Sequence, residues 1–331
     1  MGSDHKVRWG LLSTANINRR LIPAIRASKR GELVAVASRS LSKARAYANK
    51  WEIPLAYGDY AQMLSSGAID AVYISLPNHL HAEWTIQALT AGVHVLCEKP
   101  MALTLAEMDA MITASRVSGR VLAEAFMYRH HPQTKIAGNW AHSGRLGDIC
   151  LVRGVFNFAL HARDNVRLVP EYGGGCLWDV GVYPLSFAQF IFGEAPYRVA
   201  GSQWLGDSGV DETFSGLLEY SGNRMAQISS AFRTPWFTQA EIIGTKGRLT
   251  INRPFVGLEQ GRRMVFHPEK GDPLEIQVPE KELYLGEVED MHAAILDGAP
   301  NYLTLSETRD HIRTVLGLYE SARTGNFIRL D

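Results

Sequence analysis

The sequence predicts a doubly wound α/β domain in residues 1–127 and an α+β domain with an open, mostly antiparallel sheet in residues 128–331. Its 331 residues are enough for two domains of about 150 residues each. In the first part, short and continuously apolar runs alternate with helix-like segments, which is typical of a parallel sheet covered on both faces. From about residue 150, strand-like runs follow one another closely with turn residues between them, as in hairpin-linked antiparallel strands.

The alternation in the first part defines each expected element. Apolar runs predict strands at residues 7–12, 33–38, 55–57, 71–75, 94–97 and 121–123. The segments between them predict helices at residues 17–28, 41–50, 59–65, 83–91 and 105–118. Thr104 is the expected N-cap of the last of these helices, and Gly92 is the expected stop of the helix before it.

The second part contains mainly strands. They are expected at residues 149–158, 198–204, 213–220, 224–233, 240–244 and 248–251, with helices at 178–192 and 305–324. No repeat or low-complexity linker separates the two parts, so we expect an ordinary crossover near residues 124–130.

The charge balance limits the classes of partner. Lys+Arg and Asp+Glu are both 34, which argues against a dedicated nucleic-acid or anionic-membrane binder. Residues 1–127 hold 14 basic and 10 acidic side chains, a balance of +4, and the remainder has a balance of −4. The first part is therefore the better host for an anionic ligand.

Other features of the sequence indicate a cytoplasmic protein. The longest stretch without a formal charge, between Asp179 and Glu194, is shorter than the about 20 apolar residues of a membrane-spanning helix. No apolar segment of a secretory signal is visible near the start. Three cysteines without a C-x-x-C pair fit a reducing compartment.

The turn after the first strand is a candidate phosphate-binding loop. The usual fingerprint is G-x-G-x-x-G/A, and its three small positions fall on Ser13, Ala15 and Asn18. The turn still places small and polar residues where the first helix opens, as an anion site at a helix N-terminus requires. We assign the following residues to a dinucleotide: Ser13, Thr14, Ala15, Asn16 and Ile17. The alternative is a turn that only caps the helix through Ser13 or Asn16.

The end of the second strand indicates which dinucleotide binds. An acidic residue commonly holds the ribose 2′-hydroxyl of NAD there, but no carboxylate occurs between Glu32 and Glu52. Ser38, Arg39 and Lys43 offer hydroxyl, guanidinium and ammonium groups that suit a 2′-phosphate. We therefore expect NADP, with NAD as the second choice; the alternative is a solvated charge at a helix start.

Two further loops follow strands of the same predicted sheet, whose carboxyl ends border the ligand crevice. From the loop that follows the fourth strand, we expect Ser75, Pro77, Asn78 and His81 to bind the cofactor. From the loop that follows the fifth strand, we expect the same of Glu98 and Lys99, which precede Pro100. Lys99 can orient a substrate hydroxyl or lower the pKa of a neighbouring acid, although Glu98 and Lys99 could also be a surface ion pair.

His79, His81 and Glu83 also have the spacing of an H-x-H-x-E metal cluster. No cysteine or third histidine stands at a supporting distance in the sequence. We expect no metal site.

The second part supplies a complementary set of residues. Asp179 and Tyr183 follow the glycine triplet 173–175 and are four residues apart, so they project from one face if Asp179 opens a helix. A phenol titrates near pH 10, and a neighbouring Lys99 ammonium would stabilise the phenolate. In the alternative, Asp179 is only an N-cap and Tyr183 a core aromatic.

Taken together, these stretches resemble the family of glucose–fructose oxidoreductase, inositol dehydrogenase and their relatives (Gfo/Idh/MocA). The matching pieces cover nearly the whole chain in the order LLSTANI, SLPNHLHAEW, CEKPMALT, EAFMYRHHP, GGGCLWDVGVYP and YESARTG. The resemblance implies a Rossmann domain, an α+β domain whose open sheet often mediates oligomers, and a catalytic set of Lys99, Asp179 and Tyr183. Tyrosine at 183 is similar to the branch of dihydrodiol dehydrogenase, glucose–fructose oxidoreductase and NADP-dependent xylose dehydrogenase.

The expected activity is NADP-dependent hydride transfer to or from a carbinol or carbonyl carbon of a sugar or polyol. Substrate contacts are expected from Arg129, His161, Trp178 and Asp179. Three alternatives stay open: a trans-dihydrodiol dehydrogenase, a redox glycosidase with tightly held NAD, and a non-catalytic NADP sensor. The expected partners are a small-molecule substrate and a second copy of the chain, as a homodimer or homotetramer through the C-terminal sheet.

Overall fold

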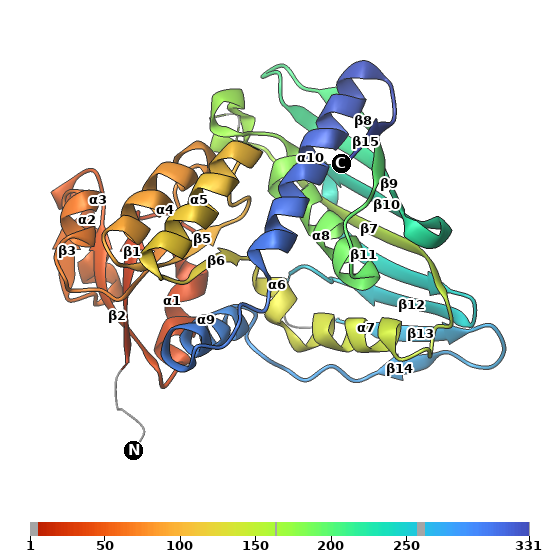
Figure 1. The fold of residues 1–331 in the computed structure, drawn as a ribbon, viewed down its shortest axis with the longest axis horizontal. Helices are drawn as coiled ribbons and strands as arrows, with labels where there is room; N and C mark the ends of the chain where they lie inside the picture. Colours follow the sequence, from red (N-terminus) through yellow and green to blue (C-terminus); the bar gives the residue numbers. More distant parts are fainter. Residues whose placement is uncertain (1–5, 163, 257–261, 331) are drawn as a thin grey trace. The chain divides into compact units, whose positions relative to one another are not determined.

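A computed structural model describes residues 6–162, 164–256 and 262–330. The chain divides into two compact units (Figure 1). Unit 1 contains Met1–His130 and Tyr284–Arg309, and unit 2 contains His131–Leu283 and Asp310–Asp331. The segment 284–309, which the sequence pattern placed with the second part, therefore clusters with unit 1.

Unit 1 is built on a six-stranded parallel sheet in the order β3-β2-β1-β4-β5-β6. Its strands are β1 (Val7–Leu12), β2 (Gly31–Ala37), β3 (Leu55–Tyr57), β4 (Ala71–Ile74), β5 (His94–Glu98) and β6 (Leu122–Ala125). Ladder residues of β1, β4 and β5 are almost fully buried, which explains their continuous apolar runs. The strand order reverses between β1 and β4, and ligands of such sheets bind at that point, beyond the carboxyl ends of the strands.

The helices of unit 1 begin and end largely where their capping residues predict. They are α1 (Asn18–Ala27), α2 (Leu41–Trp51), α3 (Tyr60–Leu64), α4 (His81–Thr90), α5 (Leu105–Ser118), α6 (Met127–His130) and α9 (Leu285–Asp297). Thr104 and Glu107 form a capping box at the start of α5, and Gly119 ends the helix in a left-handed conformation. Ser40 and Asp59 cap α2 and α3 through their side-chain oxygens. Figure 1 shows α4 and α5 side by side against the sheet.

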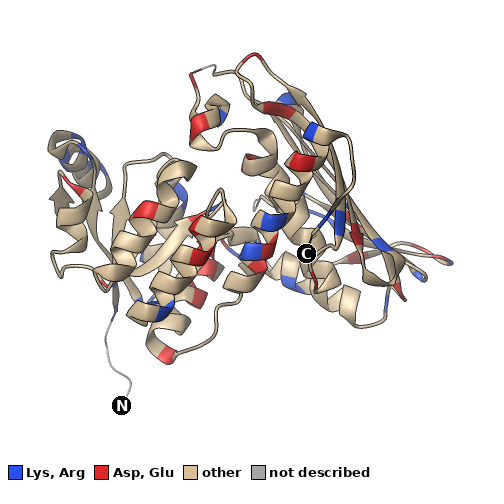
Figure 2. Ribbon diagram, turned by 45° about the horizontal axis from the view of Figure 1, so that its top comes forward, with Lys and Arg blue, Asp and Glu red and all other residues tan. Residues whose placement is uncertain are grey.

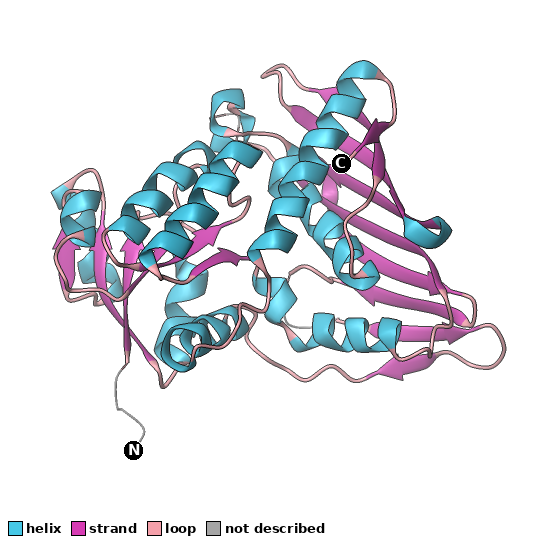
Figure 3. Cartoon of the chain, in the orientation of Figure 1, coloured by secondary structure: helices cyan, strands magenta, loops and turns pink. Residues whose placement is uncertain are grey.

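Unit 2 is built on a nine-stranded sheet in the order β14-β13-β12-β11-β7-β10-β9-β8-β15 (Figure 3). Its strands are β7 (Ile149–Ala159), β8 (Arg198–Leu205), β9 (Asp211–Tyr220), β10 (Arg224–Ala231), β11 (Arg233–Gly244), β12 (Gly247–Asn252), β13 (Met264–Pro268), β14 (Leu274–Ile276) and β15 (Ile328–Arg329). All neighbours run antiparallel except β7 and β10, which pair in parallel. The predicted open, mostly antiparallel sheet is therefore confirmed.

Three helices accompany this sheet: α7 (Pro132–His142), α8 (Val182–Phe192) and α10 (Leu305–Thr324), of which α10 begins in unit 1. Nearly every side chain of α8 is buried, so its continuous apolar sequence reflects a helix enclosed on all sides. Gly154 of β7 permits the contact between sheet and helix, because a Cβ there would lie 2.5 Å from Cβ of Pro184. The helix is thus fixed closely against β7.

The sequence pattern differs from the structure in several elements. It did not predict α6, α7, α9, β13, β14 or β15, and it divided the segment 224–244 differently. The structure turns at Phe232 and then forms one long strand β11, with a register shift between Arg233 and Phe237. Pro235 lacks a backbone donor, and such an irregularity accommodates it within a strand.

Surface charge and hydropathy agree with the balanced composition. Figure 2 shows basic and acidic residues interspersed along the elements of both units. Within the described part of the chain, no helix is long and apolar enough to cross a membrane. Cys97, Cys150 and Cys176 are free thiols.

Candidate active site

The turn between β1 and α1 has the backbone geometry of a phosphate-binding loop without its glycines. Ser13 has φ 140°, a conformation that glycine adopts freely and other residues rarely. Its Oγ accepts a hydrogen bond from the Ala15 N–H at 3.1 Å. No side chain among the described residues caps α1 at Ile17, and the N–H groups of Asn18, Arg19 and Arg20 donate to the carbonyls of Ala15, Asn16 and Ile17. The positive end of the helix dipole therefore faces the turn without a side chain over it. This turn fits the pyrophosphate of a dinucleotide.

The end of β2 presents basic side chains to solvent. Ser38 is buried, and its N–H donates to the Tyr57 carbonyl at 3.1 Å. Arg39 and Lys43 are both exposed at the start of α2. Since no carboxylate lies between Glu32 and Glu52, this end of the strand suits a phosphate better than a ribose hydroxyl pair.

The loop after β4 is fixed by a buried histidine. His81 is fully buried, with Nε2 2.8 Å from the Leu76 carbonyl and Nδ1 2.8 Å from the Pro100 carbonyl. Burial lowers the pKa of His81, although both hydrogen bonds act in the opposite direction. His81 therefore links the loop after β4 to the loop after β5. Pro77 and Asn78 lie in the first of these loops, between Leu76 and His81.

This placement does not favour the alternative metal cluster. Both ring nitrogens of His81 face carbonyl oxygens, and Glu83 lies exposed on α4, where it accepts a hydrogen bond from Gln87 at 3.1 Å. The described residues contain no group of three His, Cys, Asp or Glu side chains arranged to hold a metal ion.

Strand β5 ends at Glu98, the loop after it begins at Lys99, and the Lys99–Pro100 peptide bond is cis. Glu98 accepts a hydrogen bond from the phenol of Tyr73 on β4. Burial raises the pKa of Glu98, while the Lys99 ammonium and the Tyr73 hydrogen bond lower it. Glu98 is thus engaged inside unit 1, and Lys99 stands half-buried at the carboxyl edge of the sheet.

In unit 2, the glycine triplet allows the chain to approach its own backbone and side chains. A Cβ on Gly174 would lie 2.6 Å from the Arg167 carbonyl oxygen, and a Cβ on Gly175 would lie 2.0 Å from Oδ1 of Asp211. Gly175 also has φ 120°. The triplet therefore serves local packing just before the helix that carries Trp178, Asp179 and Tyr183.

That helix begins with a π-helical turn, Leu177–Gly181, instead of opening at Asp179. The N–H of Asp179 already donates to the Gly175 carbonyl at 3.1 Å, so Asp179 lies inside the turn and does not cap it. A π-turn inserts an extra residue per turn and is frequent at functional sites. Because of this turn, the angle about the helix axis between Asp179 and Tyr183 differs from that between two residues four apart in an ordinary α-helix.

A second carboxylate anchors the start of this turn. Oδ2 of Asp211 accepts the Leu177 N–H at 2.8 Å and the Cys176 thiol at 3.0 Å. Oδ1 of Asp211 accepts the Tyr319 phenol at 2.7 Å. Burial raises the pKa of Asp211, and these hydrogen bonds lower it.

The candidate side chains Asp179, in the π-turn, and Tyr183, in α8, have different surroundings. Asp179 forms an ion pair with Arg167, with 2.6 Å between Oδ2 and Nε. Tyr183 is buried, and its ring centroid lies 5.3 Å from that of Phe156 and 5.8 Å from that of Phe255. Tyr183 is therefore enclosed by aromatic rings in the same helical segment as a paired carboxylate.

The remaining expected contacts lie in different places. Arg129 is 1% exposed and forms an ion pair with Glu307 at 2.7 Å within unit 1. His161 is exposed in the segment after β7. Trp178 is buried, with its ring centroid 6.0 Å from that of Tyr319. Asp179, Tyr183 and Trp178 thus share one helical segment of unit 2, whereas Lys99 and Arg129 belong to unit 1.

Sequence reasoning missed Arg167 and Asp211 as parts of the site. Asp211 had no clear signal, because it stands two residues before the expected strand 213–220 and its burial is visible only in the structure. Arg167 had none, because it lies in a short 3₁₀ turn, Val166–Leu168, of an irregular segment.

Known proteins match both parts of the chain. Residues 7–126 match the Gfo/Idh/MocA oxidoreductase family with an NAD-binding Rossmann fold, and residues 135–250 match the C-terminal domain of that family. A D-xylose 1-dehydrogenase (NADP(+)) of Haloferax volcanii is 36% identical over 98% of this chain and 99% of its own length.

Solved structures agree with this match. The crystal structure of an aldose–aldose oxidoreductase from Caulobacter crescentus, complexed with glycerol, is 26% identical with a TM-score of 0.92 over 98% of this chain and 100% of that one. A 3-ketoreductase from Actinomadura kijaniata, in complex with NADP and TDP-benzene, is 26% identical with a TM-score of 0.90 over 96% of this chain and 98% of that one. The chain is therefore an enzyme of the Gfo/Idh/MocA oxidoreductase family, with an NAD(P)-binding Rossmann fold in unit 1.

Proposed function

We propose that this enzyme is an NADP-dependent oxidoreductase that transfers a hydride between the nicotinamide and a carbinol or carbonyl carbon of a sugar or polyol. The observation that carries the proposal is the helical turn of unit 2, where Asp179 is held by Arg167 and Tyr183 is buried between aromatic rings. The sugar-related names of the similar dehydrogenase, oxidoreductase and reductase support the substrate class.

Unit 1 supplies the residues for the cofactor. The uncapped start of α1 and the turn Ser13–Ile17 would hold the pyrophosphate, and Ser38, Arg39 and Lys43 the 2′-phosphate. The loops after β4 and β5 would hold the nicotinamide half, through Ser75, Pro77, Asn78, Glu98 and Lys99. His81 was expected among these contacts, but its full burial and its contacts with two backbone carbonyls favour a role in positioning the two loops. NADP, when bound, supplies the hydride acceptor or donor.

In the proposed reaction, Tyr183 removes the proton of the substrate hydroxyl, or returns it when a carbonyl is reduced. Lys99 provides the positive charge that makes a phenolate accessible at neutral pH. Asp179 accepts a hydrogen bond from a neighbouring substrate hydroxyl and fixes the orientation of the ring, while Arg167 holds its carboxylate in one position.

We keep Trp178 and His161 as proposed substrate contacts. Arg129 was expected among them, but its burial and its pairing with Glu307 favour a role in holding α6 within unit 1. A buried and paired guanidinium is costly to release for a neutral polyol.

Three other activities stay as alternatives. A trans-dihydrodiol dehydrogenase would use the same residues on a different diol. A redox glycosidase would retain NAD through purification, which the basic and carboxylate-free end of β2 disfavours. A non-catalytic NADP sensor has no use for Lys99, Asp179 and Tyr183 as a proton-transfer set.

A panel of substrates tests the proposal. Aldoses, polyols, ketosugars and trans-dihydrodiols are assayed with NADP⁺ or NADPH, and in parallel with NAD⁺ or NADH, by the absorbance of the reduced nicotinamide. We expect turnover with a sugar or polyol and a higher kcat/KM with the phosphorylated cofactor. Turnover confined to dihydrodiols, or turnover only with NAD(H), would contradict the proposal.

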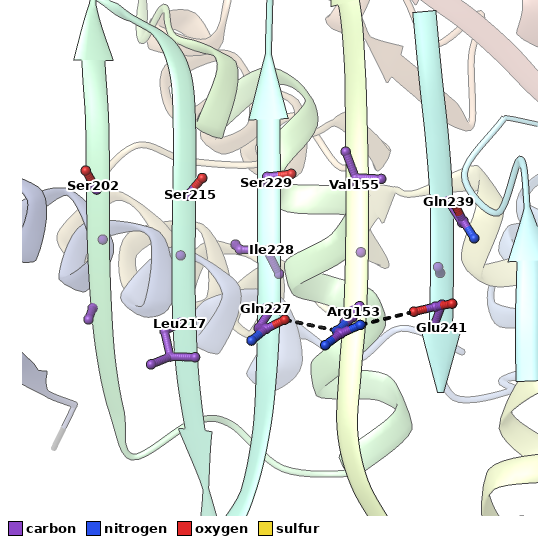
Figure 4. A pocket seen from close by; sticks show the side chains of 15 residues that line it. Arg153, Val155, Ser202, Ser215, Leu217, Gln227, Ile228, Ser229, Gln239 and Glu241 are labelled. Carbon is purple, nitrogen blue, oxygen red and sulfur yellow. Dashed lines mark hydrogen bonds and ion pairs between the residues drawn. The ribbon is translucent and has the colours of Figure 1, made fainter. Parts of the chain in front are cut away.

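We also propose that the enzyme is a homo-oligomer whose copies meet at the open face of the unit 2 sheet. A groove of about 670 Å³ lies on this face, with small side chains such as Ala200, Ser202 and Ser215 along it. Figure 4 shows a row of Ser202, Ser215 and Ser229 across neighbouring strands.

The next row on this face carries both charges. Arg153 donates to Gln227 at 3.0 Å and lies 3.7 Å from Glu241 (Figure 4). A two-fold axis over such a row can pair the arginine of one copy with the glutamate of the other, as an isologous interface requires. The charge pattern therefore favours a second copy of this chain as the occupant.

The cellular compartment is likewise a proposal. The three cysteines are free thiols, and a reducing compartment preserves that state. We propose the cytoplasm.

A further inference from the structure

The turn after β1 contains a strain that the regular fingerprint avoids. Ser13 stands at the first glycine position of that fingerprint and keeps a glycine-like φ of 140°. For a residue with a Cβ, this conformation persists only where the surroundings hold it. Something in the fold must therefore hold Ser13 in place.

A closed ring of hydrogen bonds surrounds this residue. The Asn18 amide nitrogen donates to the Ser13 carbonyl at 2.9 Å, and the Ser75 hydroxyl donates to Asn18 Oδ1 at 2.6 Å. Because the Ser75 proton is used in this way, the Ser13 hydroxyl is the donor of the 2.8 Å bond between Ser13 and Ser75. The Ser75 carbonyl oxygen, 3.2 Å from the Ser13 hydroxyl, is a second acceptor for the same proton.

The ring is buried and joins three elements. Asn18 is fully buried at the first position of α1, Ser13 is 8% exposed after β1, and Ser75 is 7% exposed after β4. The Ser13 hydroxyl also accepts the Ala15 N–H at 3.1 Å, which extends the constraint to the middle of the turn. Buried polar groups that satisfy one another fully hold a unique local geometry.

We propose that Asn18 is a positioning residue for the cofactor: with Ser13 and Ser75, it holds the turn after β1 in the glycine-type geometry that a pyrophosphate requires. Ser13 and Asn18 both stand at positions where the G-x-G-x-x-G/A pattern has a small residue. Because the ring joins the two residues, each one is suited to its position only when the other is present. The inference rests on the proposed function, because it assumes that NADP binds at this turn.

The test is a double-mutant cycle read out by NADPH binding. The full chain and its variants Asn18→Ala and Ser75→Ala are titrated with NADPH, and the dissociation constant is taken from nicotinamide fluorescence. In the chain that keeps Ser13, each substitution should weaken binding about tenfold or more, because the strained residue loses its support. In the chain that carries Ser13→Gly, the same substitutions should cost less than about threefold, because a glycine needs no support at this φ.

Ser28→Ala is the matched control. Ser28 is a buried serine at the other end of α1, and its hydroxyl lies 3.0 Å from Nδ1 of His292. It should lower the melting temperature as the loss of any buried hydrogen bond does, without changing the NADPH dissociation constant.

Two outcomes would overturn the inference. Equal losses of affinity with and without the Ser13→Gly substitution would show that Asn18 acts independently of Ser13. Unchanged NADPH affinity in both Asn18→Ala and Ser75→Ala would show that the ring only stabilises the fold. If the unmodified chain fails to bind NADPH while it binds NADH, the proposed function fails instead, and the cycle repeated with NADH still tests the ring.

Discussion

Burial and pairing divide the charged residues of the candidate site into two groups. Asp211 and Arg129 are buried and engaged by neighbours in their own units, so they hold structure. Arg39 and Lys43 are exposed at the end of a strand that lacks carboxylates, so they are available to a ligand. Asp179 is also paired, with Arg167, but it lies close to the surface, and this exposure distinguishes it from the buried Asp211.

Replacement of Tyr183 by Phe removes only the hydroxyl of the proposed acid–base. The aromatic contacts with Phe156 and Phe255 remain, so the fold and the NADPH dissociation constant should stay unchanged. We expect kcat to fall about 10²–10⁴-fold, the usual contribution of a general acid or base. Initial rates with the best sugar of the panel check this, and a variant that retains more than about half of the turnover would exclude Tyr183 from the chemistry.

Replacement of Arg39 by Ala tests the cofactor preference. The loss of a charge-assisted hydrogen bond should weaken NADPH binding about 10–100-fold and leave NADH binding nearly unchanged. Arg45→Ala, another exposed arginine on α2, is the control and should change neither. Equal weakening of both cofactors by Arg39→Ala would contradict a contact with the 2′-phosphate.

Single residues were predictable from the sequence where position alone gives them a role. Arg39 follows a strand end, and Thr104 precedes a helical run by one residue. The partner of Asp179 was not predictable, because Arg167 reaches it from an irregular segment without a periodic pattern. The hydrogen bond from Asn18 to the Ser13 carbonyl was not predictable either, because nothing in the sequence links these two departures from the glycine fingerprint.

At the scale of elements, the π-turn before α8 depends on a single buried carboxylate. Asp211→Ala would leave the Leu177 N–H and the Tyr319 hydroxyl without their acceptor. We expect the free energy of unfolding to fall by about 3 kcal/mol, as when a buried hydrogen-bond partner is removed. Chemical denaturation measures this, with the exposed Asp207→Ala as a control that should stay within about 0.5 kcal/mol. A loss no larger than that of the control would refute the anchoring role.

Helix α9 is joined to the sheet of unit 1 by a histidine that must stay neutral. Nε2 of His292 accepts the Trp9 indole N–H at 2.8 Å, and burial lowers the pKa of His292 to about 4. In the unfolded chain, the pKa is near 6.5, so the unfolded state takes up the proton first as the pH falls. Stability is therefore complete above about pH 6.5 and is lost progressively down to about pH 4.

The variant His292→Gln isolates this effect, because its amide oxygen can still accept the indole N–H. Between pH 7 and pH 5, its unfolding free energy should fall by about 1–2 kcal/mol less than that of the unmodified chain. Denaturation curves at the two pH values give the comparison. The same pH dependence in both proteins would show that His292 does not titrate on unfolding.

Elements were predictable where local signals are strong, as in unit 1. Capping boxes and continuous apolar runs place α5 and β4 within a residue or two. Helix α9 was missed because Tyr284 at its start forms no side-chain cap and acidic residues interrupt its apolar pattern. The short strands β13 and β14 gain their pairing from neighbours in the sheet, which a single sequence does not display.

For the whole molecule, the charge difference between the two parts of the sequence largely disappears in the structure. Residues 1–127 have a balance of +4, but the segment 284–309 of unit 1 holds five acidic side chains and one basic side chain. The family and the reaction class could be predicted from motifs spread over the chain. The particular sugar could not, because no motif in the sequence distinguishes one sugar from another.

Assembly is tested by a charge placed on the open sheet face. Ser215→Arg puts a long side chain in the row of small residues, and it should lower the mass measured by light scattering to that of the monomer. An interface of standard size, about 800 Å² per partner, is sensitive to such a clash at its centre. Asp272→Arg, at an exposed turn, should leave the mass unchanged. A monomeric parent chain, or an unchanged oligomer in Ser215→Arg, would contradict this interface.

The transfer of a hydride from a sugar carbon to the nicotinamide can be followed with deuterium. The enzyme is incubated with NADP⁺ and a panel of aldoses and polyols deuterated at every carbon, and the cofactor is analysed by mass spectrometry. We expect NADPH that carries one deuterium with at least one sugar of the panel, and much less of it with Tyr183→Phe. NADPH without deuterium, or no reduced cofactor with any sugar or polyol, would contradict this transfer.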